Sequence, residues 1–273
     1  MAREVDSPRP DGCERIAAAF RDAAGRAALM PYLLGGYPDL ETSRACLVAA
    51  VEAGADLVEL GIPFSDPLAD GPVIHHAATL ALERGVTPGD VLALAASVAE
   101  RVPVVVMVYA NVVFTRGTER FLDELRAAGV AGLIVPDLPF DEAAVVRAAA
   151  DERGLALVPL CAPTTPDDRL RVLAAGARGF VYAVSLTGTT GERDALPPGL
   201  DRFVARVRSL APVPVAVGFG VSRPEQAARV AEIADGVIVG SRIVRAAGEG
   251  GTDAVRTVVS ELAAAVAAVR QTA

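Results

Sequence analysis

The sequence predicts an α/β fold, a (β/α)8 barrel that forms a single domain, and three features of the chain support this prediction. Short apolar runs alternate with alanine-rich stretches of helical periodicity along nearly all of the 273 residues. Barrels of this kind commonly reach about 250 residues as one domain. No linker or low-complexity segment divides the chain, so we expect a barrel over residues 16–273 and a polar N-terminal tail at 1–15.

Eight apolar runs are the expected strands. They are rich in Val, Ile and Leu, as parallel strands that are buried on both faces usually are. Only 4% of the residues are aromatic and Trp is absent, so the core must depend on aliphatic side chains. The expected strands span residues 28–34, 57–61, 104–109, 132–135, 156–160, 180–184, 215–218 and 236–239.

Amphipathic stretches between these runs are the expected helices. A glycine near the end of several of them is typical of a helix C-terminus, as at Gly54, Gly129, Gly154 and Gly176. Helical crossovers between successive strands favour a closed parallel barrel over an open doubly wound sheet. The expected helices span residues 43–53, 89–101, 119–128, 141–153, 167–175, 201–210 and 223–233.

Charge and cysteine content narrow the class of function. The formal net charge of −8 argues against nucleic-acid binding, which needs a basic surface. A small phosphate ligand stays open, because backbone N–H groups can hold an anion in an acidic protein. Cys13, Cys46 and Cys161 follow no metal or disulfide spacing, and the N-terminus carries no apolar signal region. Because the cysteines are scattered and odd in number, we expect reduced thiols in a cytoplasmic enzyme. No apolar run of about 18 residues interrupts the chain, so we expect no membrane span.

The second apolar run carries Glu59, and a loop rich in Gly and Pro with Asp66 and Asp70 follows it. An unpaired carboxylate inside an apolar strand is costly or has a raised pKa. Glu59 could instead be paired with an arginine or a backbone amide, and the loop could be plain surface. Because the loops after the strands form the active site of such barrels, we favour a site in which Glu59 and Asp70 have separate roles.

Glycine-rich segments follow the last three expected strands, at residues 185–191, 218–222 and 240–244, and the last opens a short helix. Each segment could be a tight turn. Together they occupy the recurrent phosphate-binding position of this fold, where backbone N–H groups and a helix N-terminus meet an oxyanion. Residues 109–111 and 136–139 add polar groups after the third and fourth strands, although either segment could simply cap a loop.

Residues 59–71, which read ELGIPFSDPLADG, resemble the signature of tryptophan synthase α subunits nearly residue for residue. Residues 31–38, 109–111, 135–139, 218–220 and 240–241 resemble further marks of that family in the same order, and the resemblance runs from about residue 16 to 247. It implies a TIM barrel, which is the (β/α)8 fold. It also implies a carbon–carbon lyase of tryptophan biosynthesis that cleaves indole-3-glycerol phosphate into indole and glyceraldehyde 3-phosphate.

The resemblance assigns roles to positions of this chain. The family's catalytic glutamate falls on Glu59, the carboxylate that binds the indole N–H on Asp70, and a hydroxyl beside the glutamate on Tyr182. The phosphate contacts fall on Thr190, Gly191, Gly220, Gly240 and Ser241. The indole pocket falls on Tyr32, Met107, Ile134 and Phe219. One departure is Leu186, followed by Thr187, in a loop where many family members have an arginine.

The resemblance also implies a partner, the tryptophan synthase β subunit, in an αββα heterotetramer. Contacts with this partner are expected at Pro63, Asp66, Asn111 and Pro139. We expect no metal and no cofactor in this chain, and pyridoxal phosphate only in the β subunit. A stand-alone lyase that releases free indole and a non-catalytic activator of the β subunit remain alternatives. A Schiff-base aldolase is disfavoured, because the chain contains no lysine.

Overall fold

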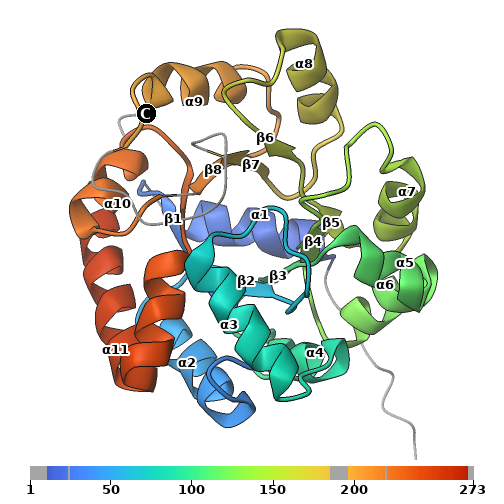
Figure 1. Ribbon diagram of the computed structural model, residues 1–273. Helices are drawn as coiled ribbons and strands as arrows, with labels where there is room; N and C mark the ends of the chain where they lie inside the picture. The colour runs from blue at the N-terminus through green and yellow to red at the C-terminus, as the bar shows by residue number, and fades with distance from the viewer. Residues whose placement is uncertain (1–10, 24, 185–195, 219, 270–273) are drawn as a thin grey trace, which may run out of the picture.

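Nine parallel strands and eleven helices alternate along the part of the chain that this computed structural model describes, residues 11–23, 25–184, 196–218 and 220–269 (Figure 1). The strands form one sheet in the order β5-β4-β3-β2-β1-β9-β8-β7-β6. They are β1 (Ala28–Leu34), β2 (Val58–Gly61), β3 (Val104–Met107), β4 (Gly132–Ile134), β5 (Ala156–Leu157), β6 (Leu160–Cys161), β7 (Val181–Val184), β8 (Val215–Gly218) and β9 (Gly236–Val239).

The two ends of this sheet are consecutive in the chain, and this closes the barrel. Only Val158 and Pro159 separate β5 from β6. The N–H of Val158 donates to the carbonyl of Leu133 at 2.9 Å, and the carbonyl of Pro159 accepts from the N–H of Tyr182 at 2.9 Å. Proline has no N–H of its own to add to the ladder, so the strand is interrupted there. The run predicted at 156–160 is therefore one barrel strand in two pieces, and the predicted (β/α)8 barrel is confirmed.

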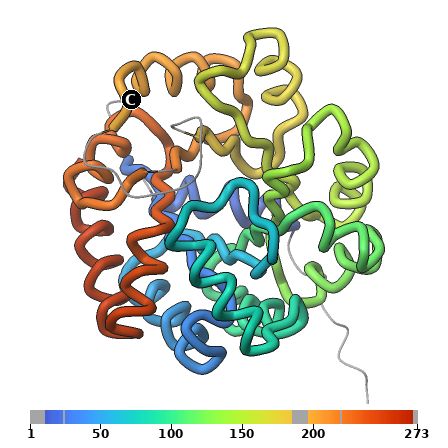
Figure 2. Tube along the Cα trace, in the orientation of Figure 1, coloured from blue at the N-terminus to red at the C-terminus, as the bar shows by residue number. Residues whose placement is uncertain are grey.

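Helices surround the strands, as the ribbon and the tube both show (Figures 1 and 2). All seven predicted helices are present, as α2, α4 and α6 to α10, whereas α1, α3 and α5 were not predicted. No helix of the described residues is long and apolar enough to cross a bilayer. The helices are α1 (Gly12–Asp22), α2 (Leu40–Glu52), α3 (Pro72–Glu83), α4 (Pro88–Ala96), α5 (Ala110–Arg116), α6 (Thr118–Ala127), α7 (Ala144–Glu152), α8 (Asp167–Ala175), α9 (Leu200–Arg208), α10 (Pro224–Ala231) and α11 (Ser241–Ala267).

Each strand contributes side chains to two apolar layers, because successive residues of a strand point to opposite faces. In β1, Leu29 and Leu33 belong to the layer between the strands and the helices. Met30 and Tyr32 belong to the cluster that fills the barrel. Tyr32 pairs in register with Glu59 of β2, so Glu59 also faces the barrel interior. The register thus carries a carboxyl group into an apolar core.

Helix α1 covers the N-terminal end of the barrel and lies behind the strands in Figure 1. Its Ile16 packs with the interior cluster, and a Cβ at Gly12 would clash with backbone carbonyls of the barrel. Arg15 donates to the carbonyl of Gly129 at 2.8 Å. This bond satisfies a carbonyl group in the loop between α6 and β4. Since α1 begins at Gly12, the boundary predicted between tail and barrel at residue 15 lies inside this helix. The loops that follow the strands lie at the opposite end of the barrel.

Candidate active site

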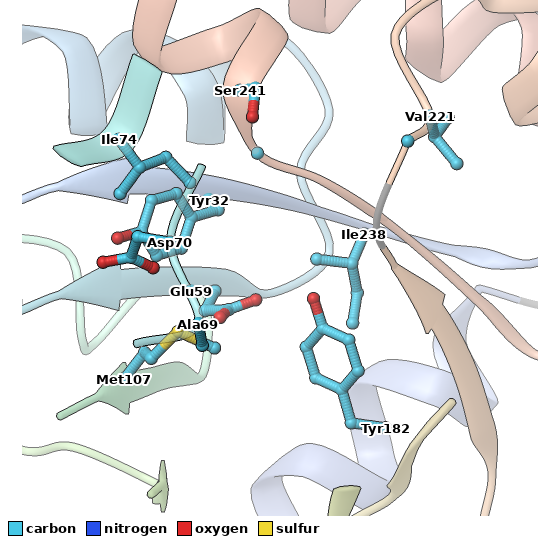
Figure 3. A pocket seen from close by; sticks show the side chains of 12 residues that line it. Tyr32, Glu59, Ala69, Asp70, Ile74, Met107, Tyr182, Val221, Ile238 and Ser241 are labelled. Atoms are coloured by element: carbon cyan, nitrogen blue, oxygen red, sulfur yellow. The ribbon is translucent and has the colours of Figure 1, made fainter. Parts of the chain in front are cut away.

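A pocket opens at the end of the barrel where the strands have their C-termini (Figure 3). It contains about 480 Å³ of space, including the solvent at its mouth. Strands β1, β2, β3, β7 and β9 supply its floor, and the segments before α3, α10 and α11 supply its walls. The lining residues are Tyr32, Glu59, Ala69, Asp70, Ile74, Met107, Tyr182, Gly220, Val221, Ile238, Gly240 and Ser241. The structure therefore brings together eight of the residues predicted for catalysis and binding.

Glu59 is the most deeply buried polar group of the pocket, with a side chain that is 1% exposed. Neither of its carboxyl oxygens has a hydrogen-bond partner among the described residues, so the paired alternative considered from the sequence is not seen there. Burial, and next the charge of Asp70, raise the pKa of Glu59 from 4.5 to about 8. At neutral pH the group therefore carries a proton that it can give to a bound molecule.

Asp70 lies in the segment between β2 and α3 and is less deeply buried than Glu59. Burial raises its pKa from 3.8 to about 6, while a hydrogen bond from Tyr109 and the nearby His75 act in the opposite direction. Asp70 is consequently ionised at neutral pH, where Glu59 is protonated. Two carboxyl groups whose pKa values are set apart by their surroundings can serve as an acid and as a fixed negative charge.

Tyr32 and Tyr182 flank the two carboxyl groups, and Figure 3 shows the Glu59 carboxyl and the Tyr182 hydroxyl pointing into the same space. Burial raises the pKa of both phenols well above 10, and the nearby carboxyl groups add to this effect, so both hydroxyls keep their protons. Each ring lies against a glycine. A Cβ at Gly61 would clash with Tyr32, and a Cβ at Gly218 would clash with Tyr182. These glycines leave the room that the two phenols occupy.

The start of α11 and Gly220 form the polar end of the pocket. Gly240 is the N-cap of α11 and provides no side-chain cap, so the first N–H groups of the helix are not capped by a side chain. Gly220 has a φ of +90°, a conformation in which any other residue is strained. A helix N-terminus with close backbone approach suits a phosphate group. The predicted Gly220, Gly240 and Ser241 lie together here, whereas Thr190 and Gly191 lie outside the described residues.

The apolar side of the pocket agrees in part with the predicted indole site. Tyr32 and Met107 line it from β1 and β3. Ile134 is fully buried in the barrel interior and pairs in register with Met107, but it is not a lining residue. The predicted Phe219 lies outside the described residues, as do Leu186 and Thr187 of the loop after β7. Ile134 and Phe219 therefore stay predictions.

Three residues that were not among the predicted site residues also shape the site. Ile74 on α3 and Ile238 on β9 are apolar walls of the pocket. Tyr109, the N-cap of α5, is a hydrogen-bond partner of Asp70. Ile238 could have been predicted from the sequence, because alternate residues of a strand share a face and Ile238 lies two residues before Gly240. Tyr109 stood in a recognised motif, yet a loop cap explained it equally well from the sequence.

The residues predicted to contact a partner follow strands at this same end of the barrel, with Asn111 in the first turn of α5 and the other three in loops. Pro63 is buried, whereas three of them are exposed: Asp66, Asn111 and Pro139. Two large apolar side chains stand out beside them, since Leu68 is 81% exposed and Phe114 is 52% exposed. This end of the barrel thus combines exposed polar residues with apolar side chains that lie in solvent.

Comparison with known proteins adds independent findings. The sequence profile of the tryptophan synthase alpha chain matches residues 19–273. Tryptophan synthase alpha chains of Prochlorococcus marinus and Synechococcus elongatus are 48% and 47% identical to this chain, over 88% and 91% of its length and 89% and 94% of theirs. Among solved structures, a chain of Mycobacterium tuberculosis tryptophan synthase is 43% identical and superposes with a TM-score of 0.87, covering 92% of this chain and 98% of its own. A chain of the tryptophan synthase complex from Pyrococcus furiosus is 36% identical with a TM-score of 0.81, covering 87% and 98%.

Proposed function

This chain belongs to the tryptophan synthase alpha chain family, and from that premise we propose how its pocket cleaves indole-3-glycerol phosphate into indole and glyceraldehyde 3-phosphate. One observation carries the proposal. A protonated Glu59 without a hydrogen-bond partner among the described residues and an ionised Asp70 share an apolar pocket that ends at a helix N-terminus. Such a pocket suits a flat apolar ring that is joined to a phosphate.

The substrate is proposed to lie across the pocket with its phosphate at the N-terminus of α11. Backbone N–H groups near Gly220, Gly240 and Ser241 would hold the phosphate oxygens. The indole ring would then rest against Tyr32 and Met107, with its N–H directed at Asp70. Binding energy from the phosphate, which does not react, aligns the bond to be broken with the two carboxyl groups.

The reaction is proposed to begin with proton transfer, because neutral indole is a poor leaving group. Glu59 gives its proton to carbon 3 of the ring, which forms a cationic indolenine, and the Asp70 carboxylate stabilises the positive charge at the ring nitrogen. The carbinol hydroxyl next loses its proton to the Glu59 carboxylate. The carbon–carbon bond breaks, its electron pair restores the aromatic ring, and the carbinol carbon becomes the aldehyde. Glu59 ends protonated, as it began.

Tyr182 is proposed to support Glu59 between these two steps. Its hydroxyl keeps its proton and points into the same space as the Glu59 carboxyl (Figure 3). While Glu59 is ionised, the phenol is able to donate a hydrogen bond to its carboxylate or to the carbinol oxygen of the substrate. A charge that is buried without any donor would be far more costly.

We propose a β subunit as the partner of this chain, with pyridoxal phosphate in that partner and no cofactor here. The proposal is supported by the exposed apolar side chains at the same end of the barrel and by the relative that is described as a tryptophan synthase complex. Indole is small, apolar and membrane-permeable, so direct transfer to a second active site would prevent its loss. We also propose a cytoplasmic location, from the scattered cysteines and the polar N-terminus of the sequence.

The test of the proposed function is an assay of the purified full-length chain with indole-3-glycerol phosphate. Release of glyceraldehyde 3-phosphate is followed with an NAD-linked dehydrogenase, and indole is measured in the same samples by chromatography. Equal amounts of the two products are expected, and Glu59→Gln serves as the inactive control. If neither product forms with or without an added β subunit, the proposed function is wrong.

A further inference from the structure

We infer that Tyr109 is a positioning residue for the cleavage reaction, one that fixes the Asp70 carboxylate toward the indole nitrogen. The inference rests on the proposed function and extends it to a residue outside the pocket. Tyr109 is not among the residues that line the pocket, whereas Asp70 is. We therefore assign its effect on the reaction to its contacts with Asp70 and the segment that carries Asp70.

The hydroxyl and the ring of Tyr109 both contact the segment that carries Asp70. Its hydroxyl oxygen accepts a hydrogen bond from the N–H of Ala69 at 3.1 Å. Its ring stacks on Phe64, with centroids 5.0 Å apart and an interplanar angle of 22°. The Tyr109 hydroxyl has a single hydrogen. Because its oxygen accepts from the N–H of Ala69, this hydrogen is left to be donated to the Asp70 carboxylate. One side chain thus holds the segment by its face and by both functions of its hydroxyl.

The segment needs such an anchor, because it has no regular structure between β2 and α3. Gly71, which follows Asp70, is the N-cap of α3 and has no side chain with which to cap that helix. Tyr109 is itself held at the start of α5, where the N–H of Ala110 donates to Asp137 at 2.8 Å. Asp70 is therefore tied to the ends of β3 and β4.

The hydroxyl also favours the charge that the reaction requires. Groups facing Asp70 come from β1, β2, β7 and α3, and they are Tyr32, Glu59, Tyr182 and His75. Burial raises the pKa of Asp70 to about 6, and the Tyr109 hydrogen bond lowers it. Loss of the hydroxyl would thus move the pKa of Asp70 upward and reduce the ionised fraction near neutral pH.

The first experiment compares Tyr109→Phe with the wild-type full-length chain, because phenylalanine keeps the ring that stacks on Phe64 and removes only the hydroxyl. We expect kcat to fall about ten- to a hundredfold with little change in KM. The acidic limb of the kcat/KM profile should also move to higher pH, so that the loss is larger at pH 6 than at pH 8. Tyr37→Phe is the matched control, since the Tyr37 hydroxyl lies against Gly248, away from the pocket.

A second comparison separates positioning from a purely structural role. If Tyr109 acts through Asp70, adding Tyr109→Phe to an Asp70→Asn chain should cost less than about threefold in kcat. Thermal melts of each variant accompany the kinetics. Should Tyr109→Phe not fold, Phe64→Leu keeps the hydroxyl and loosens the ring, and a lower kcat is again expected.

The possible outcomes distinguish this inference from the proposed function. A wild-type chain that releases no glyceraldehyde 3-phosphate contradicts the proposed function itself. An active wild type whose Tyr109→Phe and Phe64→Leu variants retain kcat and an unmoved acidic limb overturns the inference and leaves the function intact. Equal losses in the Asp70 and Asp70→Asn backgrounds would also overturn it.

Discussion

At the scale of single residues, Glu59 places stability and chemistry in conflict. Its pKa in the folded chain, about 8, is above its ordinary value of 4.5, because burial penalises the ionised form. The folded state therefore holds this proton more tightly than the unfolded state does. The contribution to stability is complete below about pH 4.5 and is lost as the pH rises through about 8. Over this window the loss approaches about 1.4 kcal/mol for each pH unit.

Replacement of Glu59 by glutamine should remove this penalty together with the reaction. We expect Glu59→Gln to lower the cleavage rate by at least about a hundredfold, because an amide cannot transfer the proton. Relative to wild type, the variant should gain stability between about pH 5 and pH 8, measured by denaturant unfolding at several pH values. The exposed Glu100→Gln is the control and should show neither effect. A Glu59→Gln chain with near-normal turnover would contradict the assigned role.

The pH dependence of the reaction should report both carboxyl groups. Asp70 must be ionised, so kcat/KM should fall as the pH drops through about 6. Glu59 must start protonated, so kcat/KM should fall again as the pH rises through about 8. The expected profile is a bell between these values. In Asp70→Asn the neutral amide cannot balance a cationic ring, so turnover should drop and the acidic limb should disappear. Full activity of that variant would remove the electrostatic half of the mechanism.

Some site residues could be predicted from the sequence and others could not, and the difference has a physical reason. Glu59 could be predicted because a charged side chain inside an apolar run is visible without knowledge of any neighbour. The pairing of Tyr109 with Asp70 could not, since the two residues are 39 positions apart and meet only when β2 and β3 lie side by side. The unpartnered state of Glu59 was also undecided, because only the packed barrel shows what surrounds its carboxyl oxygens.

At the scale of elements, apolar periodicity predicted strands better than it predicted helices near the active site. The runs at 28–34, 215–218 and 236–239 match β1, β8 and β9 at both ends. Helix α3 was missed because Gly71 and Pro72 are typical of a loop, although proline is also favoured in the first turn of a helix. A proline likewise divides the fifth barrel strand. In both cases a proline lies at a boundary: Pro72 is in the first turn of α3, and Pro159 lies between β5 and β6.

The glycine at position 220 provides a test of the phosphate site formed by loop and helix. A valine there introduces a side chain beside the N-terminus of α11 and should raise KM for indole-3-glycerol phosphate about tenfold or more. Because Gly220 has a φ of +90°, strain of about 1–2 kcal/mol is expected as well. Gly85→Val is the matched control, since Gly85 also has a positive φ, of +77°, and has open space around it. Crystals soaked with glycerol phosphate show the site directly, and an anion bound elsewhere would contradict it.

At the scale of the whole molecule, the two ends of the barrel have different tasks. Helix α1 and Arg15 close the N-terminal end with apolar packing and hydrogen bonds to carbonyl groups. The C-terminal end carries the carboxyl groups, the backbone that we propose to bind the phosphate, and the exposed Leu68 and Phe114. Since Leu68 lies on the segment that joins Glu59 to Asp70, a protein that covers Leu68 would touch the chain on which both carboxyl groups depend. The proposed docking of a β subunit at Leu68 would thereby be linked to catalysis through one stretch of sequence.

The last prediction follows from this arrangement. Mixing the chain with its β subunit should give a complex in light scattering, and cleavage should be faster than with the chain alone, because docking fixes the segment that holds Asp70. Coupling of about 1–3 kcal/mol would correspond to a 5–150-fold change if it acted on affinity. Leu68→Asp and Phe114→Asp should weaken the complex and the acceleration together, whereas Val172→Asp, at an exposed position on α8, should do neither. If no complex forms and the lone chain already turns over briskly, a lyase that releases free indole is the better description.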